Sequence, residues 1–236
     1  MLILKKIGNV FELIFKVLFP DLCLACSMRP KSKTTIFCSH CLTSLPLTDH
    51  FEVKMNTVKM HLAGRVPLHH GAALLTFRKE GIVQHILHQL KYKNRPVIGK
   101  VMGKMAASKL EQSVLFEKPD IVIPVPIHPN KIKKRGYNQS TVFGHSLGKA
   151  IHVPCDDTIL IKIIENPSQT GKSRTERVDN VAGGFKVVRT SAILNKHILV
   201  VDDVITTGAT IEACCNILLD AGAGKISVLC IAAAES

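Results

Sequence analysis

The segment HILVVDDVITTGAT, residues 197–210, limits what this chain can fold into more than any other part of it. It begins with a short continuous apolar run, which is typical of a strand buried on both faces of a parallel sheet. Asp202 and Asp203 follow that run, then a short loop that ends at Gly208, and then a helical pattern. The segment therefore predicts a strand with two acids at its carboxyl end, the edge where ligands bind open α/β sheets.

The loop and the start of the following helix are suited to hold an anion. Gly208 permits backbone conformations, or a close approach, that a side chain would block. The helix that begins near Ala209 and Thr210 offers free backbone amides and the positive end of its dipole. The two carboxylates would repel a phosphate, but they can accept hydrogen bonds from sugar hydroxyls or hold Mg2+ through water.

Strand and helix patterns alternate along the chain from residue 71 onward. The segments 71–77, 120–127, 159–164, 197–204 and 225–233 are apolar runs that predict strands. The segments 81–92, 96–110, 138–151 and 209–221 have helical periodicity. This alternation predicts an α/β fold with a mostly parallel sheet flanked by helices. The polar residues 165–184 are expected to form a mobile loop.

Four of the eight cysteines form two pairs of CxxC spacing, Cys23 with Cys26 and Cys38 with Cys41. Two such knuckles complete a tetrahedral sulfur shell, so the spacing predicts a structural Zn2+ site with no open position. His40 in place of one cysteine, a pair of disulfides, and free thiols remain as alternatives. The other four cysteines lie in apolar patterns, which favours buried, inert thiols and a reducing compartment.

We expect three regions: an N-terminal helix with the zinc finger at residues 1–46, a connector or hood at 47–70, and the α/β domain at 71–236. Residues 1–19 have an amphipathic helical pattern, expected to pack on the protein or a partner, with membrane-surface binding as the alternative. Charged residues such as Lys5, Lys6 and Glu12 interrupt this pattern, so no transmembrane segment is predicted.

The chain is strongly basic. It has 31 lysines and arginines against 18 acidic residues, a formal charge of +13. This excess favours polyanionic partners, namely nucleic acid, an anionic membrane or phosphorylated ligands. The alternative is a soluble basic enzyme whose lysines only solvate its surface.

Residues 197–210 closely resemble the fingerprint with which type I phosphoribosyltransferases bind 5-phosphoribosyl-1-pyrophosphate (PRPP). Four apolar residues, two acids, one apolar residue and a loop rich in threonine and glycine follow in that order. The resemblance implies that Asp202 and Asp203 bind the ribose, and that Mg2+ accompanies PRPP. It implies that the 5-phosphate is bound by Thr206, Thr207, Gly208, Ala209 and Thr210.

The order of the other segments resembles the ComF family of bacterial competence proteins. The four-cysteine start, LKYKNRP, the RGYNQS segment, SQTGKSRTERVDNVAGGF and the phosphate loop occur in that order. The resemblance implies a pyrophosphate loop, or a nucleic-acid contact, formed by Lys131, Lys133, Lys134 and Arg135. It also implies a flexible loop that closes over PRPP, or that faces DNA, and that contains Gln169, Lys172, Arg174 and Arg177.

Two functional hypotheses follow from this resemblance. The first is a cytoplasmic factor of natural transformation, acting at the inner face of the membrane, that binds incoming single-stranded DNA. It would bind PRPP or a related ligand and have a ComFA-type ATPase and a DprA-type DNA-processing protein as partners. The second is an active phosphoribosyltransferase of nucleotide or cofactor metabolism with incidental DNA binding. Residues 1–69 contain no tryptophan or tyrosine to read an acceptor base, so no catalytic residue is assigned and turnover stays open.

Overall fold

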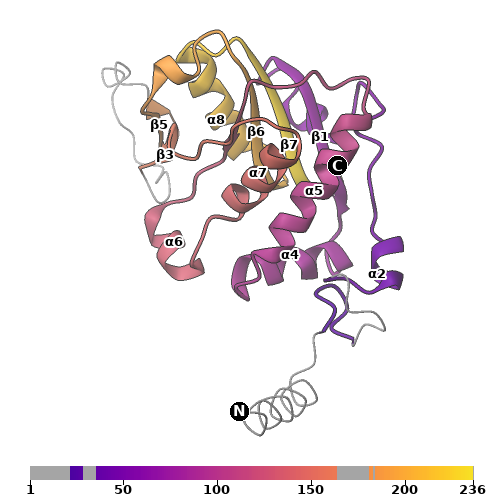
Figure 1. Cartoon of the computed structure of the whole chain (residues 1–236). Coiled ribbons are helices and arrows are strands. Elements are labelled where there is room, and N and C mark those ends of the chain that lie inside the picture. Colours follow the sequence, from indigo (N-terminus) through magenta and orange to yellow (C-terminus); the bar gives the residue numbers. More distant parts are fainter. Residues whose placement is uncertain (1–21, 29–35, 164–180, 183, 236) are drawn as a thin grey trace, which may run out of the picture. The chain divides into compact units, whose positions relative to one another are not determined.

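The computed structural model describes residues 22–28, 36–163, 181–182 and 184–235. By its internal contacts the chain divides into two compact units, Met1–Leu45 and Pro46–Ser236. The larger unit carries the sheet and most of the helices in Figure 1. The helix expected at residues 1–19 lies outside the described residues. No helix in the described part of the chain is long and apolar enough to cross a membrane.

A parallel four-stranded sheet forms the centre of the larger unit. Its strands are β1 (Leu68–Phe77), β2 (Ile121–Pro124), β6 (His197–Ile205) and β7 (Lys225–Ala234). They lie in the order β1-β7-β6-β2, and all three neighbouring pairs are parallel. The predicted parallel sheet is confirmed, with the strand that bears the acids at an inner position, where both of its neighbours hold it in register.

Helices cover both faces of this sheet (Figure 1). They are α3 (Thr57–Leu62), α4 (Ile82–Tyr92), α5 (Val97–Gln112), α7 (Gln139–Ala150) and α8 (Ala209–Asp220). A further short helix, α6 (Pro129–Arg135), has no buried residue. Strand residues alternate between the faces, as the pleat requires. Val200 lies in the core cluster that contains α8, whereas Val201 lies beneath Gly144 of α7. An added Cβ at Gly144 would approach Val201 Cγ2 to 3.0 Å, so glycine permits the close packing of α7 on the sheet.

A small antiparallel sheet lies beside α8. It contains β3 (Leu160–Lys162), β5 (Phe185–Val187) and β4 (Val181–Ala182), in that order, and the short 3-10 helix Thr190–Ala192 follows it. The strand expected at residues 159–164 is therefore present in shorter form. Of the loop expected at 165–184, residues 181–182 form β4, and residues 165–180 lie outside the described part.

Two segments differ from the sequence-based expectation. Residues 47–70, expected as an irregular connector, contain α3 and the first residues of β1. The Asn56 side chain caps α3 by accepting from the Lys59 amide at 3.2 Å, which allows so short a helix to form. Residues 129–135, expected as a basic turn, form the helix α6, because Pro129 starts it and Gly136 ends it in the left-handed region at φ 85°.

Candidate functional site

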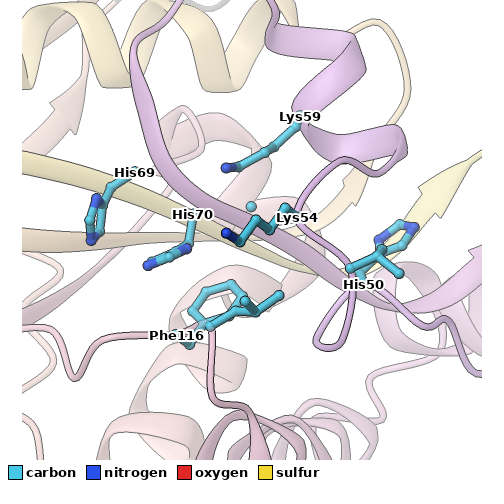
Figure 2. A pocket seen from close by; sticks show the side chains of 9 residues that line it. His50, Lys54, Lys59, His69, His70 and Phe116 are labelled. Atoms are coloured by element: carbon cyan, nitrogen blue, oxygen red, sulfur yellow. The ribbon is translucent and has the colours of Figure 1, made fainter.

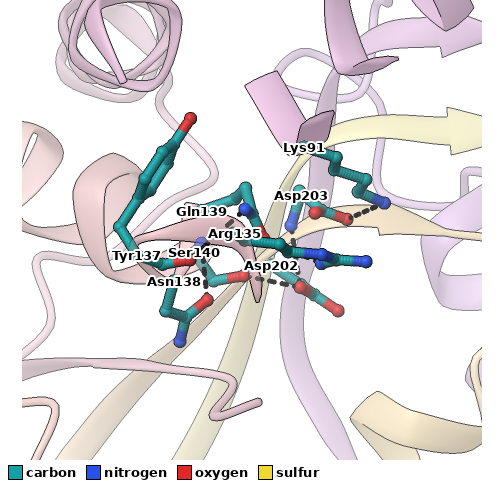
Figure 3. Close-up of polar contacts among 8 residues, drawn as sticks. All are labelled: Lys91, Arg135, Tyr137, Asn138, Gln139, Ser140, Asp202 and Asp203. Atoms are coloured by element: carbon teal, nitrogen blue, oxygen red, sulfur yellow. Dashed lines mark hydrogen bonds and ion pairs between the residues drawn. The ribbon is translucent and has the colours of Figure 1, made fainter. Parts of the chain in front are cut away.

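The two acids lie at the carboxyl end of β6 and contact different partners (Figure 3). Ser140 Oγ, on the first turn of α7, donates to Asp202 Oδ1 at 2.7 Å. The backbone amide of Asp203 donates to the same oxygen at 2.8 Å. Lys91 Nζ, from the end of α4, lies 2.9 Å from Asp203 Oδ1. Of the two adjacent carboxylates, one thus accepts a hydrogen bond from a hydroxyl group and the other forms an ion pair with an ammonium group.

Their electrostatic environments differ accordingly. Burial, and then the negative charge of Asp203, raise the pKa of Asp202 to about 7. Hydrogen bonds from Ser140 and the Asp203 amide, and the charge of Lys91, oppose that rise. Lys91 is the counter-ion of Asp203, whose side chain is only 10% exposed. Near neutral pH Asp202 is therefore about half protonated, as is expected for a buried carboxyl group beside a like charge.

The RGYNQS segment links α4 to this edge of the sheet. Tyr137 donates its hydroxyl hydrogen to the carbonyl of Leu90, next to Lys91. The Asn138 side-chain amide donates to the Val125 carbonyl at 2.9 Å, just beyond the end of β2. These bonds place the start of α7, and with it Ser140, against the end of β6.

Arg135 belongs to the same arrangement. Its Nη1 donates to Gln139 Oε1 at 3.0 Å, and its guanidinium lies 5.3 Å from the ring centroid of Tyr92. Gln139 is fully buried beside Ser140. Arg135 therefore helps to hold the start of α7, while Lys133 and Lys134 of the same helix are exposed and Lys131 is half-buried.

The loop after the acids forms a shallow polar hollow. Thr206, Thr207 and Thr210 are exposed, and the first turn of α8 begins at Ala209. Asp202 and residues 204–211 line the hollow. Gly208 adopts φ 78°, which glycine favours, and an added Cβ there would meet Leu62 Cδ2 at 3.0 Å and the His61 carbonyl at 3.3 Å. The loop thus places the predicted 5-phosphate residues around the open amides of a helix start.

Arg65, which follows α3, fixes this loop from the other side. Its Nη2 donates to the Thr207 carbonyl at 2.8 Å, and its Nη1 donates to Glu212 Oε2 at 2.6 Å on α8. One guanidinium therefore ties the loop to the helix that follows it. Residues from the expected hood region reach the phosphate loop through this contact and through Leu62.

Lys162, on β3, is a further basic residue close enough to Asp202 to be influenced by its charge. Burial, and then the positive charge of Lys131, lower the pKa of Lys162 on β3, whereas Asp202 raises it. The Lys162 ammonium lies 4.7 Å from the ring centroid of Phe185. Lys131 and Lys162 therefore add positive charge in the neighbourhood of Asp202.

The structure brings most of the predicted residues together and adds others. Asp202, Asp203 and residues 206–210 form one site, with α6 leading into α7 beside it. The proposed flexible-loop residues Gln169, Lys172, Arg174 and Arg177 lie outside the described residues. The sequence did not single out Lys91, Ser140, Arg65 or Lys162. Lys91 and Ser140 lie in the segments LKYKNRP and RGYNQS, so a signal was present, whereas nothing local marks Arg65.

The four clustered cysteines of the smaller unit are positioned to hold a metal ion. The sulfur atoms of Cys23, Cys26, Cys38 and Cys41 all lie within 4.8 Å of one another. Cys38 caps α2 (Ser39–Thr43), with its Sγ accepting from the Cys41 amide at 3.4 Å, and Cys23 Sγ accepts from the Cys38 amide at 3.3 Å. Amides that donate to sulfur stabilise thiolates, the form that binds metal ions.

The chain is similar in sequence to several known proteins. A protein from Escherichia coli K12 named "DNA utilization protein YhgH" is 26% identical over 149 residues, 62% of this chain and 65% of that protein. "Competence protein F" of Haemophilus influenzae is 26% identical, over 61% of this chain and 64% of its own. "Competence protein ComFC" of Bacillus subtilis is 29% identical over 49% of this chain and 47% of its own. The resemblance to competence proteins is thereby confirmed, and the aligned part spans less than two thirds of each relative.

Solved structures similar to the chain include a glutamine PRPP amidotransferase from B. subtilis. It is 22% identical, the match covers 61% of this chain and 30% of that one, and the TM-score is 0.44. The adenine phosphoribosyltransferase of Saccharomyces cerevisiae is 16% identical over 60% of this chain and 72% of its own, with a TM-score of 0.39.

A family model described as "Phosphoribosyl transferase domain" matches residues 88–236, which include Lys91, Ser140, both acids and the phosphate loop. The matched segment is more than half of the chain and contains three of the four strands of the parallel sheet. The chain therefore belongs to the phosphoribosyl transferase domain family.

Proposed function

We propose that this chain binds PRPP, or a related phosphorylated ligand, at the carboxyl edge of its sheet and binds single-stranded DNA in the cytoplasm during natural transformation. The observation that carries the first part is the pair Asp202 and Asp203 directly beside a polar hollow at the start of α8. The names of the relatives, competence protein F, ComFC and DNA utilization protein, support the second part.

The arrangement fits a phosphoribosyl group in three places. The carboxylates accept hydrogen bonds from the two ribose hydroxyls, and a protonated Asp202 still offers an acceptor oxygen. The threonine hydroxyls and the amides at the start of α8 take the 5-phosphate. Lys131 and Lys162 supply positive charge for the pyrophosphate, with Mg2+ as the counter-ion that pyrophosphate ordinarily carries.

A second candidate function is transfer of the phosphoribosyl group to an acceptor. It is favoured by one observation: α3 and Arg65, from the expected hood region, contact the phosphate loop. A hood beside the site would place an acceptor and exclude water from an oxocarbenium-like reaction. Under this hypothesis DNA binding is incidental.

The proposed DNA surface centres on α6. Lys133 and Lys134 are exposed on a helix next to the site, where ammonium groups can pair with backbone phosphates. The chain has few aromatic side chains, so phosphate contacts are expected to outweigh base stacking. A ComFA-type ATPase and a DprA-type DNA-processing protein are the partners proposed for handing the strand in and out.

Zn2+ is the ion proposed for the cysteine site. A tetrahedron of sulfur atoms with Zn–S bonds of about 2.3 Å has S···S edges of about 3.8 Å. Cys26 Sγ and Cys38 Sγ are 3.9 Å apart, which fits such an edge. Four thiolates leave no position for a substrate, so the role proposed for the ion is structural.

The test of the PRPP site is thermal protection by PRPP with Mg2+. Wild-type protein should melt at higher temperature with the ligand, by mass action on the folded state. The Asp202→Ala/Asp203→Ala variant should lose the shift, because the ribose loses its acceptors. Asp220→Asn, an exposed acid at the far end of α8, is the matched control and should keep it. Equal protection of the double variant and wild type would refute the ribose assignment.

The same double variant separates the two functions in cells. A deletion strain complemented with it should transform poorly if the ligand site serves DNA uptake. Normal transformation, together with loss of phosphoribosyl transfer from PRPP in vitro, would favour the metabolic hypothesis.

A further inference from the structure

A second cluster of metal-binding side chains lies at the opposite edge of the sheet. His69 and His70 are at the start of β1, and Glu117 precedes β2. The amino ends of the parallel strands meet here, whereas Asp202 and Asp203 lie at the carboxyl end. The ligand atoms of His69, His70 and Glu117 all lie within 4.8 Å of one another.

The two histidines have buried nitrogen atoms without a hydrogen-bond partner among the described residues, namely Nε2 of His69 and Nε2 of His70. His69 Nε2 lies 3.2 Å from Glu117 Oε1, an ion-pair distance, without a well-aligned hydrogen bond between the two atoms. Buried polar atoms in native proteins almost always have a partner. Two that converge on one carboxylate are placed to bind a common ligand.

Neighbouring histidines do not share this property. His50 accepts from the Ala73 amide at 3.2 Å and contacts Thr57 Oγ1 at 3.1 Å with its other nitrogen. His197 Nε2 lies 2.8 Å from Ser227 Oγ. Among these four histidines, buried ring nitrogens without a hydrogen-bond partner occur only in His69 and His70.

The carboxylate of this cluster has a partner that orients it. Lys225 Nζ lies 2.8 Å from Glu117 Oε2 and orients the carboxylate, leaving Oε1 toward His69. A bond that orients a ligating carboxylate in this way is a common support for a metal site.

The cluster borders a cavity of about 240 Å³ that His70, Lys54 and Lys59 line (Figure 2). Two ammonium groups beside a bare divalent cation would repel it. An ion at this place thus needs a negatively charged ligand on its cavity side, and the lysines would attract that ligand.

We propose that His69, His70 and Glu117 bind a divalent transition-metal ion whose coordination is completed by an anion in the cavity. Imidazole and carboxylate ligands suit ions such as Zn2+, Co2+ and Ni2+. Two histidines and one carboxylate leave positions open, unlike the four-cysteine site, so this ion would be accessible to a small carboxylate or phosphate ligand. The site is separate from the phosphoribosyl site and does not depend on its function.

The test uses Co2+ as the probe on the full chain after a brief wash with EDTA, which strips an open site more readily than a four-thiolate one. Wild type should bind one equivalent with the weak visible bands of nitrogen and oxygen ligands. His69→Gln/His70→Gln should lose it, and Glu117→Gln, a change at an exposed side chain, should weaken it by at least about tenfold. His145→Gln, which changes an exposed histidine of α7, is the control and should bind as wild type does.

Three outcomes would overturn the site: no Co2+ uptake, an intense thiolate charge-transfer band as the sole signal, or unchanged binding by Glu117→Gln. The anion is tested separately by adding acetate to a non-coordinating buffer. Co2+ should then bind wild type more tightly, and Lys54→Gln/Lys59→Gln should show less gain. Equal affinity with and without acetate would overturn the assignment of an anionic ligand.

Discussion

At the scale of single residues, Asp202 and Asp203 show how one strand gives two adjacent carboxyl groups different properties. They point to opposite sides of the pleat, so Asp202 meets Ser140 of α7 and Asp203 meets Lys91 of α4. Burial and the charge of Asp203 raise the pKa of Asp202, whereas Asp203 forms an ion pair with Lys91. The two acids therefore differ in their interactions, although they are adjacent in the chain.

The raised pKa of Asp202 predicts a pH dependence of stability. Its folded pKa is about 7, above the ordinary value of 3.8, so the stability it contributes is present below about pH 4 and is lost as pH rises through 7. Asp202→Asn keeps an acceptor for Ser140 and removes this titration. Between pH 5 and 8, the free energy of unfolding should fall less in the variant than in wild type, by on the order of 2 kcal/mol. Chemical denaturation at each pH measures it.

Asp220→Asn should retain the wild-type slope and serves as the control. Parallel pH profiles for wild type and Asp202→Asn would mean that Asp202 ionises normally in the folded protein.

Gly208 predicts a second residue-scale effect, on folding and on ligand binding together. Gly208→Ala should cost about 1–2 kcal/mol from its left-handed backbone, plus a further cost from its crowding against Leu62 and His61. Gly64 has a similar φ of 70° but nothing within 4 Å of an added Cβ, so Gly64→Ala measures the backbone cost alone. Urea unfolding of both variants separates the two costs, and PRPP protection should weaken only for Gly208→Ala. Equal destabilisation by Gly208→Ala and Gly64→Ala would show that the loop can accommodate a Cβ atom at position 208 without crowding.

At the scale of elements, α6 and α7 divide the RGYNQS region into an exposed part and a structural part. Lys133 and Lys134 face solvent on α6, whereas Arg135 is bonded to Gln139 and packs on Tyr92. A test of phosphate contacts should therefore change the lysines and keep Arg135, because its removal would disturb the start of α7 and Ser140.

The element-scale prediction is that Lys131→Gln/Lys133→Gln/Lys134→Gln weakens single-stranded DNA binding for all sequences alike. The slope of log affinity against log salt should flatten by up to about 0.7 for each lysine that no longer pairs with a phosphate. Fluorescence anisotropy at several salt concentrations measures both effects. The matched control removes the same charge from exposed lysines of α5 and α7, namely Lys100, Lys104 and Lys149.

The result for this triple variant also shows whether α6 binds PRPP, DNA or both. Loss of PRPP protection with normal DNA binding would identify α6 as a pyrophosphate-binding element. Loss of both would mean that one surface serves both ligands, and PRPP should then compete with DNA. An altered base preference at constant salt slope would contradict the backbone-contact proposal.

At the scale of the whole molecule, the chain consists of two units with different sources of stability. The larger one has an extensive apolar core around the parallel sheet. The smaller one is only Met1–Leu45, too short for such a core, so its folding should depend on the metal.

We therefore predict one tightly bound Zn2+ per chain, and that removing it unfolds the smaller unit while the larger one keeps its cooperative transition. Elemental analysis gives the stoichiometry, and calorimetry before and after chelation follows the transitions. Cys23→Ser should lose the zinc, whereas Cys155→Ser, at a thiol whose pKa burial raises to about 12, should retain it. Substoichiometric zinc after metal-replete expression, or loss of both transitions on chelation, would contradict the prediction.

The sequence by itself determined the elements whose cause is local. Apolar runs and helical periodicity placed the four strands of the parallel sheet, β3, and the helices α4, α5, α7 and α8. The order of acids, glycine and helix start located the loop between β6 and α8, because this order depends on neighbouring residues. The two CxxC pairs marked the cysteine site for the same reason. The short helices α3 and α6 were not predicted, because they depend on single capping residues, Asn56 and Gly136, and have no apolar periodicity.

Only the tertiary structure decided what surrounds the acids and what lies at the far edge of the sheet. Lys91, Ser140 and Arg65 come from three separate parts of the chain, and no local pattern predicts that Lys91 and Ser140 will contact the acids or that Arg65 will contact the loop after them. His69 and Glu117 lie far apart in the chain and meet because β1 and the segment before β2 reach the same edge of the sheet. Contacts between side chains that are far apart in the sequence depend on the strand order and on the packing of the elements, and these exist only in the folded chain.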